Sequence, residues 1–372
     1  MPSLRTISQL KNAFRFLRKG SEPASGPAKV SWEVINSCDS RCKSCQRWTE
    51  TTSPRMLSFD EGRKLLGEIA DAGTLSVSFT GGEPTLREDL FDLVSHARSL
   101  GLSTALSSNA LTLDDAKAKA LVASGLKVLS ISIDGPEPEL NDDIRGVPGY
   151  FEKAIAAIGR VKALRGRSRW PRLHVNATLS DSNVGVFDKM ADVTVAAGAD
   201  ALTIQPVHNF AGIHLGTPPS MRLMAENQGR VREAIERIRT RWPKLMPHPG
   251  GFLDGVAEYV ADPKALYRYR CAAAFLFAQI DPDGHVYPCP IKFASIGNVR
   301  EKSFGEIWRS REATQVRRRI EAGDHPMCWM NCIAPMTLLA DDVRRFRFGD
   351  LLRPRVLRHV FSKAFVGGAS AG

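Results

Sequence analysis

Apolar and polar positions along the chain follow one repeating unit that begins near residue 30. Each unit is a short, near-continuous apolar run followed by a longer segment in which apolar residues recur at helical spacing. Near-continuous apolar runs are typical of parallel strands in a sheet that helices cover. The six runs are KVSWEVIN, LSVSFT, LSTALSS, KVLSISI, RLHVNATL and ALTIQPV.

Six successive strand–helix units predict an α/β fold, a partial (β/α)6 barrel whose site lies in the loops after the carboxyl ends of the strands. A doubly wound sheet is the alternative, but no GxGxxG motif follows the first strand. Ser58 and Glu61 form a capping-box pattern for the first helix, and Gly73 marks its end. Thr85 and Glu88 predict the start of the second helix.

The net charge of +11 comes from the two ends of the 372-residue chain. Residues 1–29 hold six Lys or Arg against one Glu, residues 344–372 hold seven against one Asp, and the remainder is balanced. A neutral body argues against a nucleic-acid-binding protein, which more often carries basic residues across its working face.

The compartment follows from what the sequence lacks. No apolar run is long enough to span a membrane, and charges interrupt the N-terminus too often for a signal peptide, so we expect a cytoplasmic protein. In a reducing compartment, seven cysteines indicate metal ligands or reactive thiols before disulfides.

Three of the cysteines share one loop directly after the first predicted strand, at the rim where such barrels place their chemistry. They are Cys38, Cys42 and Cys45. Three thiolates hold three corners of a [4Fe–4S] cubane and leave one iron without a protein ligand, and an open position is typical of a catalytic metal. A zinc site completed by a His or Asp elsewhere is the alternative.

The stretch FTGGEPT ends the second predicted strand and contains Gly81, Gly82, Glu83 and Pro84. The two glycines let backbone groups approach a ligand closely, and Glu83 offers an acceptor for an ammonium group. Together with the C-x3-C-x2-C loop, this stretch resembles the radical S-adenosylmethionine (SAM) superfamily over residues 30 to about 210. The resemblance implies that the three cysteines bind a [4Fe–4S] cluster, that SAM binds its open iron, and that SAM cleavage yields a 5′-deoxyadenosyl radical.

The same resemblance indicates the side chains that contact SAM. The stretch from Gly81 to Pro84 holds the amino group, and Arg145 resembles the arginine that pairs with the carboxylate. The ends of the third to sixth strands supply further candidates for the ribose, carboxylate and adenosine contacts, with ordinary capping of strand ends and turns as the alternative. These candidates are Asn109, Ser132, Asp134, Thr178 and Gln205.

One position departs from the superfamily pattern. The residue before the last loop cysteine is usually aromatic and lies near adenine, but here it is Ser44. The adenine contact must therefore come from elsewhere, and Trp48 and Phe79 are the candidates.

The other four cysteines are Cys271, Cys289, Cys328 and Cys332. The segment RCAAAFLFAQIDPDGHVYPCP predicts a β-hairpin around DPDG, and GNVREKSFGEIW predicts a turn and a helix. Four thiols close one site completely, and zinc is one candidate for it. The pattern resembles the SPASM/twitch appendage of radical SAM enzymes, which implies one auxiliary [4Fe–4S] cluster that transfers electrons.

Two subfamilies fit less well. The molybdopterin-pathway cyclase uses three cysteines on its auxiliary cluster, whereas this chain offers four. Sulfatase-maturing enzymes place an Asp after the hairpin cysteine, and this chain has Pro290 there.

The resemblance implies an oxidative reaction, either dehydrogenation or bond formation, with an electron donor such as flavodoxin or ferredoxin. A small molecule is the favoured substrate, and a ribosomal peptide or protein and a lipid-linked molecule are the alternatives. The expected organisation has five parts. They are a basic amphipathic segment (1–29), the core barrel (30–210), a helical bridge (211–265), the auxiliary cluster domain (266–335) and a basic tail (336–372).

Both ends carry apolar residues among basic ones. In the N-terminal segment Leu4, Ile7, Leu10, Phe14 and Leu17 recur at helical spacing. In the tail, Pro354 interrupts any single helix. Packing of these segments on the barrel is one interpretation, and peripheral binding to an anionic membrane is the other.

Overall fold

The computed structural model describes residues 4–18, 22–45, 47–208 and 221–345. The expected basic tail beyond residue 345, with its apolar positions and Pro354, lies outside the described residues. No helix in the described ranges is both long enough and apolar enough to cross a membrane.

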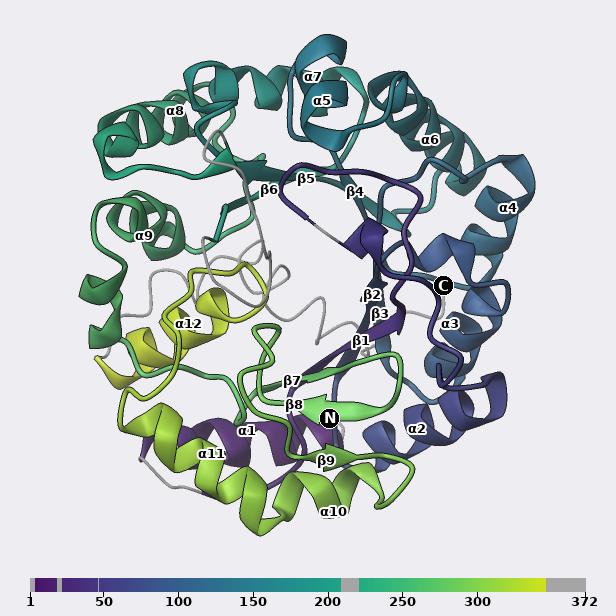
Figure 1. Cartoon of the computed structure of the whole chain (residues 1–372), viewed down its shortest axis with the longest axis vertical. Helices are drawn as coiled ribbons and strands as arrows, with labels where there is room; N and C mark the ends of the chain where they lie inside the picture. The colour runs from purple at the N-terminus through teal and green to yellow at the C-terminus, as the bar shows by residue number, and fades with distance from the viewer. Residues whose placement is uncertain (1–3, 19–21, 46, 209–220, 346–372) are drawn as a thin grey trace.

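Six parallel strands form the core of one curved sheet, and helices surround it as an outer ring (Figure 1). Within the described chain the sheet has nine strands in the order β6-β5-β4-β3-β2-β1-β7-β8-β9. The core strands are β1 (Lys29–Ile35), β2 (Ser76–Gly81), β3 (Ser103–Ser108), β4 (Val128–Ser132), β5 (Arg172–Leu179) and β6 (Ala201–Pro206). This is the partial barrel that the strand–helix alternation predicts.

Helices connect and cover these strands. Those of the core are α2 (Phe59–Asp71), α3 (Leu90–Ser99), α4 (Asp115–Ala123), α5 (Pro138–Arg145), α6 (Tyr150–Arg165) and α7 (Met190–Ala196), and α8 (Gln228–Arg241) and α9 (Gly250–Ala261) follow. The capping box of Ser58 and Glu61 is confirmed at the start of α2. The predicted start at Thr85 is wrong, because a short 3-10 helix (Pro84–Leu86) comes first and α3 begins after Asp89.

The two faces of the core sheet differ in polarity. Trp32 contacts the helix layer, since a Cβ on Gly62 of α2 would lie 2.7 Å from its ring, and Phe79 is its register partner on β2. Register partners on parallel strands point to the same face, so the inner face carries Glu33 and Thr80. The prediction of near-continuous apolar strands is therefore wrong for the inner face, which is not covered by the helix ring.

The auxiliary segment continues the core sheet. Strand β7 (Phe277–Ile280) pairs in parallel with β1, and β8 (His285–Tyr287) and β9 (Gly297–Asn298) add antiparallel strands. The predicted hairpin around DPDG is confirmed, with Gly284 at φ +90° in its turn. Helices α10 (Phe304–Arg309), α11 (Arg311–Glu321) and α12 (Ala334–Arg344) complete the segment.

Helix α1 (Leu4–Leu17) lies across the amino-terminal ends of the strands. The amide of Gln9 donates to the carbonyls of Gly26 and Gly73, just before β1 and β2. The amide of Asn12 donates to the carbonyl of Phe275, just before β7. The helix therefore closes the end of the barrel opposite to the cysteine loop.

Candidate iron–sulfur and SAM site

The loop with Cys38, Cys42 and Cys45 follows β1 and is held by the GGEP turn at the end of β2. The amide of Gly82 donates to the carbonyl of Ile35 at 2.8 Å, and the amide of Glu83 donates to the carbonyl of Ser37 at 2.9 Å. A Cβ on Gly82 would lie 2.5 Å from the carbonyl oxygen of Asn36. The glycines are therefore needed where the turn approaches the cysteine loop.

Glu83 fixes the ends of β2 and β3 together. Its buried carboxylate accepts hydrogen bonds from the Thr85 hydroxyl (2.6 Å) and amide (3.0 Å), the Ser108 hydroxyl (2.7 Å) and the Asn109 amide (2.7 Å). Burial raises the pKa of the Glu83 carboxyl, and these hydrogen bonds oppose the rise. The predicted contact with an ammonium group stays a prediction beside this structural role.

Arg145, at the end of α5, reaches the loop from the other side. Its guanidinium pairs with buried Asp134 at 2.8 Å and lies 3.8 Å from Cys42 Sγ. The next residue, Gly146, has φ +67° and packs so closely that a Cβ would overlap the carbonyl oxygen of Arg41. Arg145 is thus held beside the cysteines by the left-handed end of its helix.

The three loop thiols are suited to an iron–sulfur cluster, because the iron ions carry the positive charge that stabilises buried thiolates. Burial raises the pKa of the Cys38 thiol to about 12 and also raises that of Cys45. Bound metal stabilises the thiolate form that burial disfavours. Two donors lie near the sulfurs: Asn109 Nδ2 is 3.9 Å from Cys38 Sγ, and Arg145 Nη1 is 3.8 Å from Cys42 Sγ. The Ser40 hydroxyl also lies 3.2 Å from Cys42 Sγ. Such donors stabilise metal-bound thiolates.

The four later cysteines form a second set in the auxiliary segment. Cys271 precedes β7, Cys289 follows β8, and Cys328 and Cys332 precede α12. Burial raises the pKa of Cys328 well above its ordinary value, and the charges of the other three thiolates raise it further. Burial, with a smaller contribution from the charge of Cys332, raises the pKa of Cys271 to about 11. Four thiols that repel one another as thiolates suit a shared metal centre.

In the described part of the chain, no three His, Cys, Asp or Glu side chains converge as ligands of a single ion would. The cysteines of a cubane bind different irons, and their sulfurs lie further apart than the ligands of one zinc ion.

The inner face of the sheet brings three further candidates together. Ser132, Thr178 and Gln205 are half-buried near the carboxyl ends of β4, β5 and β6, and Thr178 pairs with Gln205 in register. Sequence reasoning missed their neighbours on this face, although strand alternation indicates them. These are the half-buried Thr80, Ser107 and Asn176.

The remaining candidates have different surroundings. Asn109 Nδ2 donates to Asp39 of the cysteine loop at 2.6 Å. The suggestion of Phe79 as an adenine contact is wrong, because its ring is fully buried against Trp32 on the helix side of the sheet. Trp48, just after the cysteine loop, is exposed.

Comparisons with known proteins agree with this geometry. The family model for the "Radical SAM superfamily" matches residues 32–195, and the SPASM model, "Iron-sulfur cluster-binding domain", matches residues 271–333. These matches favour iron–sulfur clusters over the zinc alternatives for both cysteine sets.

Two curated relatives are similar along most of their length. PqqA peptide cyclase of Rhodopseudomonas palustris is 30% identical over 307 residues, which cover 77% of this chain and 74% of that protein. AdoMet-dependent heme synthase of Oleidesulfovibrio alaskensis is 29% identical over 299 residues, covering 76% and 74%. Among solved structures, Streptococcus suis SuiB bound to S-adenosylmethionine matches with a TM-score of 0.65 at 19% identity, covering 85% of this chain and 74% of that one, which shows a shared fold.

Proposed function

Because this chain belongs to the radical SAM superfamily and carries a SPASM domain, we propose that it catalyses an oxidative modification, a dehydrogenation or bond formation, on a peptide. It is an enzyme whose cofactors are SAM, the SAM-binding cluster and an auxiliary iron–sulfur cluster. When bound, the cluster and SAM would supply the radical chemistry that abstracts a hydrogen atom from the substrate. The chain itself must position SAM, hold the substrate and exclude water.

One observation carries the proposal. The cysteine loop is locked between the GGEP turn and Arg145, at the same end of the barrel as the half-buried polar side chains of the inner face. The backbone of the turn fixes the loop, and the guanidinium of Arg145 offers a positive charge to a carboxylate beside Cys42. Hydroxyl and amide groups such as those of Ser107, Asn176 and Thr178 then offer hydrogen bonds to a polar substrate.

The peptide assignment rests on relatives and on this polarity. A relative at 30% identity is named as a peptide cyclase, and the structurally similar SuiB has been solved with its precursor peptide SuiA. Peptide groups match the hydroxyl and amide side chains on the inner face. The small molecule favoured by the sequence is the second candidate, because similarity to AdoMet-dependent heme synthases is almost as high.

Anaerobic assays test both levels of the proposal. Reconstituted protein with dithionite and SAM should form methionine and 5′-deoxyadenosine, and a variant with the three loop cysteines changed to Ala should form neither. Extract fractions from the source cells that stimulate 5′-deoxyadenosine formation should then lose this effect after protease treatment. A stimulating fraction that resists protease would support the small molecule instead.

An electron donor such as flavodoxin or ferredoxin has a candidate docking place near the auxiliary cysteines. A groove of about 220 Å³ is lined by Cys271 together with Arg268, Arg270 and Arg344. Glu321 and Asp341 also line this groove and pair with Arg270 and Arg344, so the three arginines leave a small excess of positive charge, which favours association with an acidic protein. Reduction of the clusters by an acidic flavodoxin should therefore slow as salt rises, while reduction by dithionite should change much less.

We also propose that α1 binds anionic membrane surfaces peripherally. Its buried contacts come from Gln9, Asn12 and Phe16, whereas Leu10 and Phe14 are 60% and 57% exposed. Exposed Lys11 and Arg15 flank these apolar side chains, and each basic residue near an anionic surface adds about 1 kcal/mol. Because α1 closes the barrel end opposite to the cysteine loop, this contact turns the site away from the lipid and gives no support to a lipid-linked substrate.

Liposome sedimentation tests the membrane proposal without disturbing the buried side of α1. Wild-type protein should sediment with anionic vesicles at low salt but not with neutral ones. The exposed double variant Leu10→Ser/Phe14→Ser should lose this binding and keep its SAM cleavage. Equal sedimentation of the variant and the wild type would contradict the proposal.

A further inference from the structure

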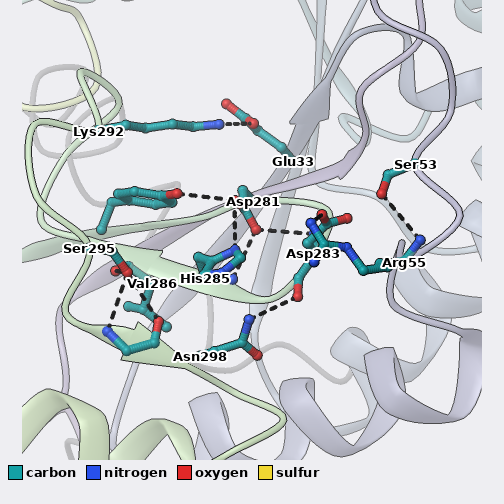
Figure 2. Close-up of polar contacts among 12 residues, drawn as sticks. Glu33, Ser53, Arg55, Asp281, Asp283, His285, Val286, Lys292, Ser295 and Asn298 are labelled. Atoms are coloured by element: carbon teal, nitrogen blue, oxygen red, sulfur yellow. Dashed lines mark hydrogen bonds and ion pairs between the residues drawn. The ribbon is translucent and has the colours of Figure 1, made fainter.

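Three charged residues from different parts of the chain meet on the inner face of the barrel. Glu33 lies on β1, Arg47 lies two residues after the last loop cysteine, and Lys292 lies three residues after Cys289. Figure 2 shows Lys292 reaching across from the auxiliary segment to Glu33. These three residues form a loop-bridging triad.

Both basic residues of the triad lie within hydrogen-bond distance of the Glu33 carboxylate. Arg47 Nη2 lies 2.9 Å from Glu33 Oε1 and 3.0 Å from Oε2, so one nitrogen spans both oxygens. Lys292 Nζ lies 2.6 Å from Glu33 Oε2. The Glu33 side chain is 10% exposed, and those of Arg47 and Lys292 are 25% and 23% exposed. Solvent therefore screens these interactions much less than those of a surface pair.

Lys292 adopts a backbone conformation that its residue type disfavours. Its φ is +55°, in the left-handed region that non-glycine residues rarely occupy, and its amide donates to the carbonyl of Cys289 at 3.1 Å. Such conformations persist only where the surroundings hold them, and they concentrate at functional sites. The side chain of Lys292 is held by the ion pair with Glu33 and lies over the ring of Tyr287, three residues after the auxiliary-cluster cysteine Cys289.

Building on the proposed function, we infer that Glu33 is a positioning residue that holds the loop of the SAM cluster, through Arg47, and the loop of the auxiliary cluster, through Lys292, in one fixed arrangement. A buried ion pair adds little net stability compared with an apolar replacement, but it specifies one geometry. Here the geometry that it specifies is the placement of the two cluster loops relative to each other.

The chain offers a matched control. Arg300 of the auxiliary segment pairs with Glu61 of α2 through Nε (2.6 Å) and Nη2 (2.9 Å). This second ion pair also joins the auxiliary segment to the core, but it belongs to neither cysteine loop. If the two parts simply needed ion pairs between them, breaking this more exposed pair would also produce a defect, whereas positioning of the loops requires only the triad.

The experiment compares Lys292→Met, Lys292→Arg and Glu61→Gln with wild type, each reconstituted anaerobically. Lys292→Met leaves the pair of Glu33 and Arg47 intact and cuts only the arm to the auxiliary loop. We expect it to keep its iron, to change the electron paramagnetic resonance spectrum of the SAM-bound cluster, and to slow 5′-deoxyadenosine formation about tenfold, since a displacement near 1 Å costs up to about a hundredfold. Lys292→Arg should restore both readouts, and Glu61→Gln should match wild type.

Each other result overturns the inference. A Lys292→Met enzyme with the wild-type spectrum and rate would show that the ion pair between Lys292 and Glu33 does not position the cluster loops. Loss of iron in Lys292→Met shows a folding role, as does an equal defect in Glu61→Gln. Failure of Lys292→Arg to rescue removes the ion pair as the cause. Failure of the proposed function itself is distinguishable, because wild-type protein would then form no 5′-deoxyadenosine.

Discussion

Replacing Gly82 by Ala tests whether the GGEP turn holds the cysteine loop. The added Cβ would lie 2.5 Å from the carbonyl oxygen of Asn36 and closer still to that of Ser37, while real Cβ contacts are not found below 3.0 Å. The opposing atoms belong to the backbone, so no side chain can rotate away. The Asn36 contact alone requires the loop to retreat by 0.5 Å, and the closer Ser37 oxygen requires a larger displacement.

The loss of stability in Gly82→Ala follows from this overlap and from the hydrogen bonds that the overlap breaks. Overpacking costs about 1–3 kcal/mol. The amides of Gly82 and Glu83 each donate to the loop backbone, and each lost bond costs about 1 kcal/mol. We therefore expect the free energy of unfolding to fall by about 3–5 kcal/mol if the loop stays in place. If the loop moves instead, SAM cleavage should slow by about tenfold or more.

The assay measures iron content, thermal unfolding and 5′-deoxyadenosine formation in the Gly82→Ala protein beside a matched control. Gly67, in α2, has no atom within 4 Å of an added Cβ. Gly67→Ala should therefore gain up to about 1 kcal/mol of stability, as expected in a helix interior, and keep full activity. A Gly82→Ala protein with wild-type stability and activity would refute the steric reasoning, as would an equal loss in Gly67→Ala.

Three further predictions concern the clusters and Arg145. Anaerobic reconstitution should give about eight iron atoms per chain, and Ala at the three loop cysteines should leave about four, from the auxiliary cubane alone; zinc in place of the second four would contradict this. Cys328→Ala should still cleave SAM but stop net substrate oxidation, so continued turnover without the auxiliary cluster would rule out its role as electron acceptor. Arg145→Met leaves Asp134 as a buried carboxylate without its ion-pair partner, which should lower the free energy of unfolding in urea by about 3–5 kcal/mol. Adding Asp134→Asn should recover most of this stability but not SAM cleavage. Recovery of both would show that the arginine has only a structural role.

Local chemistry allowed the sequence to predict several features correctly. The DPDG turn places its hairpin because Gly284 supplies the positive φ that the turn needs. The capping box at Ser58 and Glu61 forms within a single helical turn. The family assignment also rests on short motifs. The spacing of the three loop cysteines and the GGEP stretch can be read directly from neighbouring residues in the sequence. Features of this kind depend on residues close in the chain.

Two predictions that the structure contradicts share one cause. Near-continuous apolar strands disagree with the alternation of serines and threonines with apolar residues in several of the runs. Reading that alternation indicates a polar inner face and would have found Thr80, Ser107 and Asn176. The same alternation places Phe79 beside Trp32 on the helix side and excludes it as an adenine contact.

Other features were decided only by the tertiary structure. Glu33 and Lys292 are 259 residues apart, and they meet because β7 pairs with β1 and extends the core sheet. The sequence around each residue does not indicate its partner. A single Glu in a strand, or a Lys shortly after a cysteine, is as consistent with a solvent-exposed side chain as with a buried ion pair. The sequence by itself determined the motifs, the strand–helix alternation and the chemistry, because these follow from neighbouring residues. The assembly of the strands into one sheet determined which charged groups face one another, because contacts between distant segments depend on strand order and register.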